Sequence, residues 1–354
     1  MPVSASSRVF VATVSLALLA GCSGSTSVPP QSPVSAQSVA RSGARTAASG
    51  YRADISLARP GIRGLLSTGA PHFKGDAKDF TGTAWVTDEA ANLLYKVSAA
   101  GKIKAIGTGW NQPQGVAIDK AGHVYVADTA NSRVVVLTKA GKADTILNDP
   151  GEFPVAVGVA ADGTIGVVNL TSTSGGAGSI SFYSSLSQSE PTSTASGLLY
   201  QDYSGGFDAS DNFYVLGVDA NDGIHVGVVS AGGTTVADTG IDTSTYLFPG
   251  GLQVIESGKG AKTVQTLTVG DQGAPVVYTY ALPGYAAGAS VSLGGSGDVV
   301  GYSFQKNLKA VGAADAEFAE VNFYAWPAGG SSPTASVAGF EEPGGIGIVA
   351  TGDE

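Results

Sequence analysis

The sequence predicts an all-β fold in which short strands recur in sheets of about four. Three observations predict it. Gly accounts for 51 of 354 residues and Pro for another 16, so turns are frequent. Only 14% of the residues are charged, which is low for a protein with many solvated helices. Apolar runs of strand length alternate with turn formers, and similar runs return about every 40 residues.

Residues 1–21 have the layout of a secretory signal peptide. Arg8 precedes an apolar run of about a dozen residues, which is too short to cross a hydrocarbon layer of about 30 Å comfortably. The run therefore predicts a cleaved signal and not a membrane span. It ends in Leu19-Ala20-Gly21-Cys22, and these four residues closely resemble the bacterial lipobox.

Cys22 is the only cysteine of the chain, which excludes an internal disulfide and a cysteine-based metal site. The lipobox resemblance implies that Cys22 becomes the lipid-modified first residue of the mature chain, held at the membrane by several acyl chains. Ser23 follows, and by resemblance to the Gram-negative sorting rule the absence of Asp there implies the outer membrane. We expect the cell envelope, on the periplasmic face or the cell surface. An ordinary signal peptide with a chance cysteine is the alternative.

Three further segments follow the signal. Residues 22–50 are rich in Ser, Pro and Ala and bury too little apolar surface to fold, which predicts a disordered tether. Residues 51–78 regain large apolar side chains without a clear repeat, and we expect an approach segment that packs on the folded body. Residues 79–354 carry the repeats and form the main domain.

Charge is distributed unevenly along the chain, whose net charge is −10. Residues 22–75 hold six basic side chains against a single acid, Asp54, so the main domain is strongly acidic. An acidic body repels phosphate backbones, which argues against nucleic-acid binding. The cationic stalk is interpreted as a solvated tether, with contact to an anionic membrane surface as the alternative.

The clearest repeat begins at Pro113-Gln-Gly-Val-Ala-Ile-Asp119 and continues through strand-like runs that end at Asp128 and Leu137. Each run is bounded by turn formers. This unit resembles an NHL repeat. Related segments occur 40 residues earlier, around Asp88, and 41 residues later, from Pro154 to Asn169, and weaker copies follow toward the C-terminus.

A period of 40–48 residues with about four strands predicts the blades of a β-propeller, because a lone blade leaves both faces uncovered and must stack around an axis. The C-terminal Pro343-Gly-Gly-Ile-Gly-Ile-Val349 repeats the first-strand pattern, whereas the first blade begins with its second strand, at Thr83. We therefore expect this C-terminal strand to join the first blade and close the ring.

First strands near residues 113, 154, 202, 249, 288 and 343 predict an NHL-type six-bladed β-propeller. The weak point of this count is the stretch 284–297, which is too short for both an outer strand and the next inner strand. We expect the propeller to be a monomer.

Propellers with this repeat resemble both binding scaffolds and enzymes, such as calcium-dependent lactonases and peptide-amidating lyases, and the fold does not choose between them. A lactonase-like site needs several oxygen ligands around an axial calcium ion. Glu342-Pro343-Gly344 resembles a Glu-Gly-Pro of those enzymes, but it also fits the approach to a first strand, as in Asn111-Gln112-Pro113. Asn169 aligns with Asp88 and Asp128, where a short polar side chain caps a turn.

The remaining polar motifs are interpreted as structural. Asp219-Ala-Asn-Asp-Gly223 lacks the spacing of an EF-hand and predicts a turn. The three histidines, His72, His123 and His225, show no convergent pattern of the kind a zinc site needs. Gly175-Gly-Ala-Gly178 lacks the helix or Lys of a phosphate-binding loop.

Large aromatic side chains fall mostly in the expected strands, where packing between blades explains them. A sugar- or peptide-binding surface at the loop ends is the alternative. These side chains are Trp85, Trp110, Trp326, Tyr183, Tyr214, Tyr278, Tyr280 and Tyr324.

The sequence thus predicts a lipid-anchored cell-envelope propeller that binds a protein, glycan or small ligand without catalysis. Cys22 is the one site residue it assigns, for lipidation; it assigns no catalytic residue, no cofactor and no metal. The alternative is a calcium-dependent, lactonase-like hydrolase or lyase with an axial metal. Three or more convergent carboxylate or Asn oxygens would favour the enzyme, and a channel lined by Gly, Val and Thr would favour the binding module.

Overall fold

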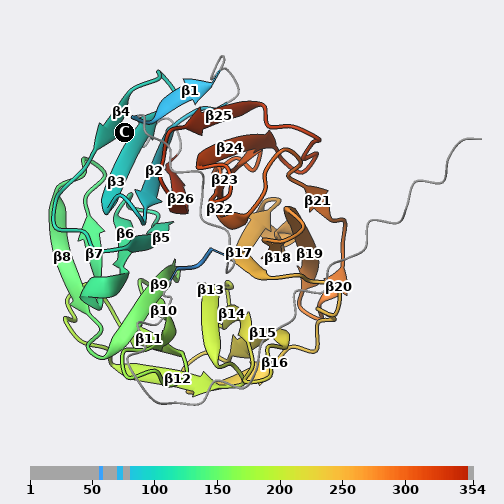
Figure 1. Ribbon diagram of the computed structural model, residues 1–354. Helices are drawn as coiled ribbons and strands as arrows, with labels where there is room; N and C mark the ends of the chain where they lie inside the picture. The colour runs from blue at the N-terminus through green and yellow to red at the C-terminus, as the bar shows by residue number, and fades with distance from the viewer. Residues whose placement is uncertain (1–55, 59–69, 75–79, 350–354) are drawn as a thin grey trace, which may run out of the picture. The chain divides into compact units, whose positions relative to one another are not determined.

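Short antiparallel strands make up most of residues 56–58, 70–74 and 80–349, which are the part of the chain described by the computed structural model (Figure 1). The signal peptide, Cys22 and the tether lie outside these residues. The described part contains no α-helix, only the two 3₁₀ turns η1 (Thr129–Asn131) and η2 (Gly260–Lys262). Within it, no helix has the length and apolar character needed to cross a membrane.

Two four-stranded sheets contain the clearest repeats of the sequence. The first has the order β26 (Pro343–Val349), β2 (Thr83–Asp88), β3 (Leu93–Ser98) and β4 (Ile103–Ala105). The second has the order β5 (Pro113–Ile118), β6 (Val124–Asp128), β7 (Arg133–Leu137) and β8 (Ala143–Asn148).

An eight-stranded sheet follows along the chain. One antiparallel half contains β9 (Glu152–Val159), β10 (Ile165–Ser172), β11 (Ser179–Tyr183) and β12 (Ser193–Gly197). The other contains β13 (Gln201–Phe207), β14 (Phe213–Val218), β15 (Ile224–Val229) and β16 (Thr235–Asp238). The outer strands β12 and β16 join the halves through parallel pairing of Ser196 with Thr235 and Gly197 with Val236.

Two five-stranded sheets complete the described part. One contains β17 (Pro249–Ser257), β18 (Val264–Asp271), β19 (Val276–Leu282), β20 (Ala286–Ala287) and β21 (Val291–Ser292), with both short strands paired to β19. The other has the order β1 (His72–Lys74), β25 (Ala335–Ala338), β24 (Glu320–Ala325), β23 (Ala310–Asp315) and β22 (Val299–Phe304).

The sheets stand around a common centre, each with an edge strand innermost (Figure 1). This arrangement confirms an all-β propeller. The expected first strand near residue 288 is wrong, since the innermost strand of that region is β22. The stretch 283–298 is rich in Gly, Ser and Ala and forms only the short strands β20 and β21 together with isolated bridges such as Leu293 to Gly330.

The pairing predicted between the two ends of the main domain is observed. β26 runs antiparallel to β2, with Trp85 opposite Gly347 and Val86 opposite Ile346. Val86 and Ile346 are both buried in one apolar cluster with Phe323 and Phe340. The C-terminal strand thus covers an edge of β2 that would otherwise be exposed.

Candidate functional site

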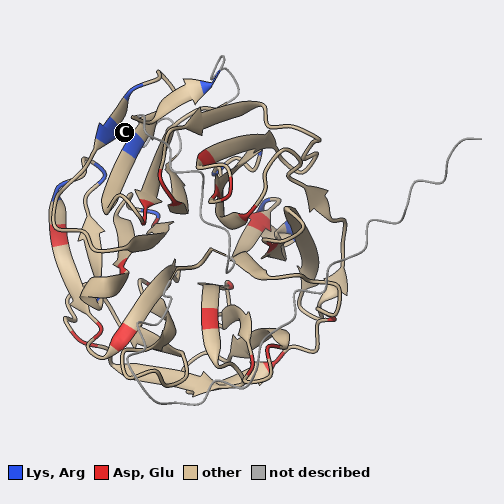
Figure 2. Ribbon diagram, in the orientation of Figure 1, with Lys and Arg blue, Asp and Glu red and all other residues tan. Residues whose placement is uncertain are grey.

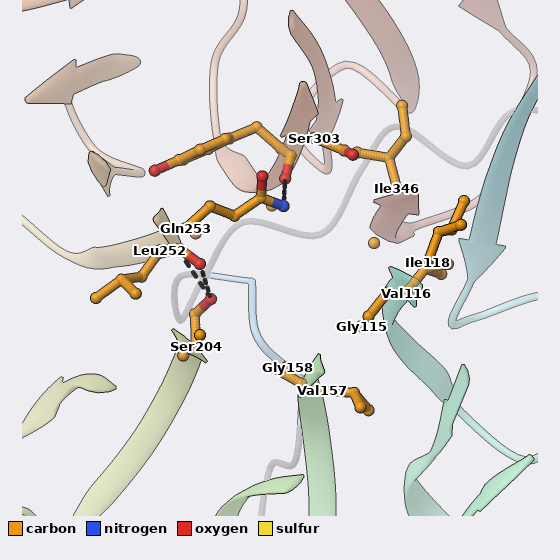
Figure 3. Close-up of a pocket in the computed structure, with 18 of the residues that line it drawn as sticks. Gly115, Val116, Ile118, Val157, Gly158, Ser204, Leu252, Gln253, Ser303 and Ile346 are labelled. Atoms are coloured by element: carbon orange, nitrogen blue, oxygen red, sulfur yellow. Dashed lines mark hydrogen bonds between the residues drawn. The ribbon is translucent and has the colours of Figure 1, made fainter. Parts of the chain in front are cut away.

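The centre of the ring is a channel of about 450 Å³, a size typical of small-molecule sites. Residues of β5, β9, β13, β17, β22 and β26 line it, and most of them are Gly, Val, Ala or Ile (Figure 3). The lining residues contain three charged side chains, Asp119, Lys120 and Lys306. The wall of the channel is therefore mainly apolar.

Glycine near the start of the innermost strands has a packing cause. A Cβ on Gly115 would lie 2.4 Å from the carbonyl oxygen of Val155, and a Cβ on Gly345 would lie 2.6 Å from that of Gln114. Neither distance admits a side chain. The repeated pattern of Pro, any residue and Gly thus marks places where neighbouring innermost strands approach each other closely.

Three polar side chains interrupt the apolar wall (Figure 3). The Ser204 Oγ accepts the N–H of Leu252 at 2.8 Å, and the Gln253 Nε2 donates to the carbonyl oxygen of Tyr302 at 2.9 Å. The Ser303 Oγ accepts the N–H of Ile348 at 3.2 Å. These bonds hold the side chains in place, while the described residues offer no partner to the Oε1 of Gln253.

The charged lining residues gather at one end of the channel. Asp119 and Lys120 follow the end of β5, and Lys306 follows the end of β22. Burial opposes ionisation of Asp119, but hydrogen bonds from His123, with Nδ1 at 2.7 Å, and from Tyr125 outweigh burial and lower the pKa of the carboxyl. Asp119 is therefore an ionised carboxylate already held by its own turn.

Calcium chemistry does not fit this channel. A hard cation needs several convergent oxygen ligands, and Asp119 is the only carboxylate among the lining residues. In residues 56–58, 70–74 and 80–349, no group of three or more His, Cys, Asp or Glu side chains is placed to hold a metal ion. No step of a lactonase-like reaction can be derived from these residues.

The model of the NHL repeat family matches residues 111–137, which contain β5, β6 and β7. The chain carries an NHL repeat. No curated protein matches the chain in sequence.

Solved structures share the fold of this chain well beyond the NHL repeat. A chain of the nidogen/laminin complex has 15% identity and a TM-score of 0.57, over 75% of this chain and 97% of that one. A protein of unknown function from Bacteroides caccae has 12% identity and a TM-score of 0.55, over 76% of this chain and 99% of that one. At such identities these likenesses concern the fold alone, and with the NHL repeat they support an NHL-type propeller.

Within the NHL repeat, Asp128 binds the loop before its own innermost strand. Its Oδ1 accepts the N–H of Asn111 at 2.8 Å, and its Oδ2 accepts a hydrogen bond from Arg133 Nε at 2.7 Å. Asp88 occupies the same position of the first sheet and binds the backbone before β26. Asn169 differs, because its Nδ2 donates to the hydroxyls of Ser179 and Ser181. The expectation of turn capping at Asn169 is therefore wrong.

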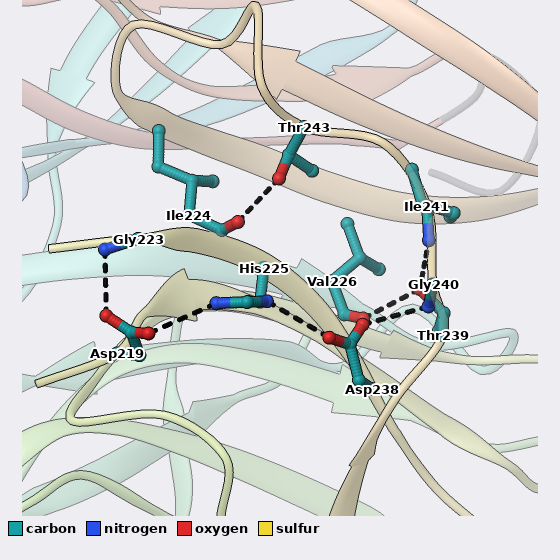
Figure 4. Close-up of polar contacts among 10 residues, drawn as sticks. All are labelled: Asp219, Gly223, Ile224, His225, Val226, Asp238, Thr239, Gly240, Ile241 and Thr243. Atoms are coloured by element: carbon teal, nitrogen blue, oxygen red, sulfur yellow. Dashed lines mark hydrogen bonds and ion pairs between the residues drawn. The ribbon is translucent and has the colours of Figure 1, made fainter. Parts of the chain in front are cut away.

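Asp219 organises a turn, as the sequence predicts. Its Oδ1 accepts the N–H groups of Asn221 and Gly223, both at 2.8 Å. His225 lies beside it, with Nε2 3.3 Å from Asp219 Oδ2 and Nδ1 3.1 Å from Asp238 Oδ2 (Figure 4). Asp219 lies in the turn before β15, His225 lies on β15 and Asp238 lies on β16. None of the three is among the lining residues of the channel.

The other singled-out residues have structural surroundings. His72 lies in the edge strand β1, and Glu342 precedes β26 with its N–H bound to Asp88. The predicted packing role of the aromatic side chains is confirmed for those that are fully or nearly fully buried: Trp85, Trp110, Tyr183, Tyr214, Tyr280 and Tyr324.

Sequence reasoning missed a cluster of three buried carboxyls at the start of β9 and β13, where Figure 2 shows acidic segments. Burial and the charge of Asp149 raise the pKa of Glu152 to about 7, and burial and the charge of Glu152 raise that of Asp202 to about 8. Burial also raises the pKa of Asp149 to about 6, against hydrogen bonds from Ser181 and Asn169. The Glu152-Phe-Pro154 and Gln201-Asp-Tyr203 segments give no sign in the sequence that they meet.

Proposed function

We propose that the protein is a lipid-anchored cell-envelope propeller that acts as a non-catalytic binding module through its axial channel. One observation carries this proposal: a channel of about 450 Å³ whose lining, among the residues that the structure describes, is mainly apolar and contains a single carboxylate and no histidine. Such a concave, mostly apolar site with a few fixed polar groups suits ligand binding. Neither Ser204 nor Ser303 has a base beside it among the lining residues, so the channel offers no activated nucleophile.

The proposed architecture is six blades of the NHL type. The eight-stranded sheet counts as two blades, because only the parallel pairing at Ser196–Gly197 joins its antiparallel halves. Each half brings one innermost strand, β9 or β13, to the channel. With the other four sheets this gives six innermost strands around the axis.

The anchoring belongs to the proposal too. Leu19-Ala20-Gly21-Cys22 at the end of an apolar run supports lipidation of Cys22 and attachment to the outer membrane, and the segment 22–50 would serve as tether. The acidic main domain argues against nucleic acid as a partner, and we propose a monomer that meets a protein, glycan or small ligand. A chain of similar fold occurs in the nidogen/laminin complex, and this supports a protein among the proposed partners.

Lipidation is tested in cells with a clickable palmitate analogue. Full-length wild-type chain is expected to take up the label and to fractionate with membranes, because the acyl chains anchor it. Cys22→Ser is expected to lose both the label and the membrane fraction. An unlabelled wild-type chain released into the soluble fraction would overturn the anchor.

Binding is tested by native mass spectrometry of the full-length protein after detergent extraction from the envelope. We expect a co-purifying organic molecule in the wild type and its loss in Gly206→Leu. Gly206 lines the channel, and a Cβ there meets no atom closer than 3.9 Å, so the substitution adds bulk beside the channel without a backbone clash at Cβ. Unfolding curves of both proteins establish that the variant is folded. Stoichiometric calcium or zinc in the wild type, in place of an organic molecule, would instead support the enzyme.

A further inference from the structure

A short segment that precedes the first strand, residues 56–58, contributes Leu57 to the lining of the channel. Leu57 lines the channel with residues of β5, β9 and β26, although it precedes every strand of the five sheets. The side chain is only 5% exposed and packs in an apolar cluster with Val155, Tyr203 and Val300. Figure 1 shows residues 56–58 in blue near the centre of the ring.

Specific hydrogen bonds hold this segment. The Gln272 Nε2 donates to the carbonyl oxygen of Leu57 at 2.8 Å, and the pair is buried. The Ser56 Oγ donates to Glu342 Oε1 at 2.8 Å and accepts the N–H of Ala58 at 3.1 Å. Two different sheets thus bind Ser56 and Leu57, and the Ser56 hydroxyl also holds Ala58, which favours a fixed position over a passing contact.

Leu57 and the lysines lie at opposite ends of the channel. Glu342 directly precedes β26, and Gln272 directly follows β18, whose end pairs with the start of β17. Both contacts therefore lie where innermost strands begin. Lys120 and Lys306 follow the ends of the innermost strands β5 and β22. Leu57 therefore lines the end of the channel where the innermost strands begin, and the charged rim lies at the other end.

The lining between these ends defines the chemistry of a ligand. Its described residues include no charged side chain, because Asp119, Lys120 and Lys306 all belong to the rim. A charged group moved into this part would lose its hydration without gaining a partner. An uncharged, largely apolar molecule loses little, and the Oε1 of Gln253 and the hydroxyl of Ser303 serve one polar group.

We propose that the channel is a blind pocket for an elongated, uncharged and mainly apolar small molecule, which enters at the Lys120 and Lys306 rim and stops against Leu57. This inference rests on the proposed binding function and adds the ligand class, the direction of approach and the residue that sets the depth. Leu57 belongs to the chain itself, so the depth of the pocket is built into the approach segment.

The ligand class is tested with two fluorescent probes on the full-length protein. N-phenyl-1-naphthylamine and 8-anilino-1-naphthalenesulfonate share an apolar body, and only the second carries a charge. We expect the uncharged probe to bind at least tenfold more tightly, and we expect Gly206→Leu to abolish its binding. Tighter binding of the sulfonate would overturn the ligand class, whereas binding of the uncharged probe that survives Gly206→Leu would overturn the channel as the site.

The depth is tested by displacing the uncharged probe with 1-alkanols of increasing length. Affinity should rise about fourfold per methylene until the chain reaches Leu57, and should then stop rising. Leu57→Ala should move this limit to a longer alkanol and Leu57→Phe to a shorter one. Leu247→Ala is the matched control, because it removes the same atoms from a side chain that is 55% exposed.

The alkanol series distinguishes the role of Leu57 from the binding function of the channel. An unchanged limit in both Leu57 variants, with probe binding still lost in Gly206→Leu, would overturn the role of Leu57 and leave the binding function standing. Absence of probe and alkanol binding to the wild type would overturn both.

A cysteine at position 57 tests the closed end independently of affinity. In Leu57→Cys we expect reaction with methyl methanethiosulfonate but not with a 5-kDa maleimide polymer, because only the small reagent fits the channel. The wild type, whose only cysteine is Cys22, measures the background. Equal reaction with both reagents would show that residue 57 is open to solvent, and would overturn the plug.

Discussion

The carboxylate of Asp88 accepts the backbone N–H groups of Glu341 and Glu342, at 2.8 and 2.9 Å, from the opposite end of the propeller sequence. The N–H of Glu89 returns a bond to the carbonyl oxygen of Glu342 at 2.8 Å. Asp88 is 1% exposed, so water cannot replace these bonds. Asp88, which occupies the same position of its sheet as Asp128, thus also stabilises the ring at the point where the two ends of the propeller sequence meet.

Asp88→Ala should destabilise the propeller strongly. It removes the acceptor of the half-buried N–H groups of Glu341 and Glu342, and a buried group left unpaired costs up to about 1–3 kcal/mol. Urea unfolding followed by circular dichroism measures the change in the free energy of unfolding. Asp162→Ala is the control, because Asp162 holds only an exposed turn through Thr164. Equal losses in the two variants would contradict the closing role of Asp88.

A disulfide across the closure should stabilise the fold. Val86 and Ile346 are directly opposite in the antiparallel pair of β2 and β26, so a Val86→Cys and Ile346→Cys double variant places two thiols at bonding distance. Oxidation should raise the free energy of unfolding by about 2–4 kcal/mol, since it joins distant parts of the chain. The control pair Val86→Cys and Ile348→Cys is out of register and should stay reduced in a thiol assay. Oxidation of the control at the same rate would contradict the register of β26.

The sequence predicts the parts of this fold that depend on local pattern. Pro113-Gln-Gly and Pro343-Gly-Gly mark innermost strands, because close approach of neighbouring strands at Gly115 and Gly345 leaves a trace in the residue type. The stretch 283–298 leads to the wrong first strand near residue 288, because irregular bridges and two-residue strands carry no periodic signal. The channel as a candidate site follows from the predicted ring.

Contacts between distant segments are beyond the reach of pattern. Leu57 is one apolar residue in a segment without a repeat, and only the folded structure places it in the channel. The Asp149, Glu152 and Asp202 cluster likewise arises from two separate strand starts. Neither Ser56 with Glu342 nor Gln272 with Leu57 has a sequence spacing that could announce it.

The cluster predicts a fall in stability with rising pH. The ordinary pKa values of Glu and Asp side chains are 4.5 and 3.8, whereas burial and neighbouring negative charge raise the pKa of Glu152 to about 7 and that of Asp202 to about 8 in the folded protein. Between the pKa values of the unfolded chain and those of the folded chain, the folded chain binds more protons than the unfolded chain. The free energy of unfolding therefore decreases as pH rises from about 4 to about 8. The contribution is present in full below pH 4.

Asp202→Asn should flatten this dependence and make the protein more stable than the wild type at pH 8. The amide keeps the shape of the side chain and cannot ionise. Urea unfolding at pH 5, 6, 7 and 8 measures the slope, and Asp162→Asn, at an exposed turn, controls for the loss of one acidic residue. A slope in Asp202→Asn that matches the wild type would contradict the assignment to this cluster.

Phe213 provides a test of packing between the two halves of the eight-stranded sheet. Its ring is fully buried, and a Cβ added at Gly158, Gly166 or Gly205 would lie 2.9, 2.6 or 2.6 Å from it. Gly166→Ala should therefore cost about 1–3 kcal/mol by overpacking, and Phe213→Leu should cost a similar amount through lost contacts.

The double variant Gly166→Ala and Phe213→Leu should be more stable than the sum of the single losses predicts, because the smaller side chain leaves room for the added methyl group. Residues in contact deviate from additivity by about 0.5–3 kcal/mol, and urea unfolding of the four proteins measures this coupling. Pairing Phe213→Leu with Gly301→Ala controls for the effect of an added methyl group elsewhere, because Gly301 has no positive φ and a Cβ there would lie 3.5 Å from its nearest atom, an ordinary contact. Strict additivity in the Gly166 pair would contradict the close contact between this glycine and the ring, and with it the tight seam that aligns β9 and β13 along the channel.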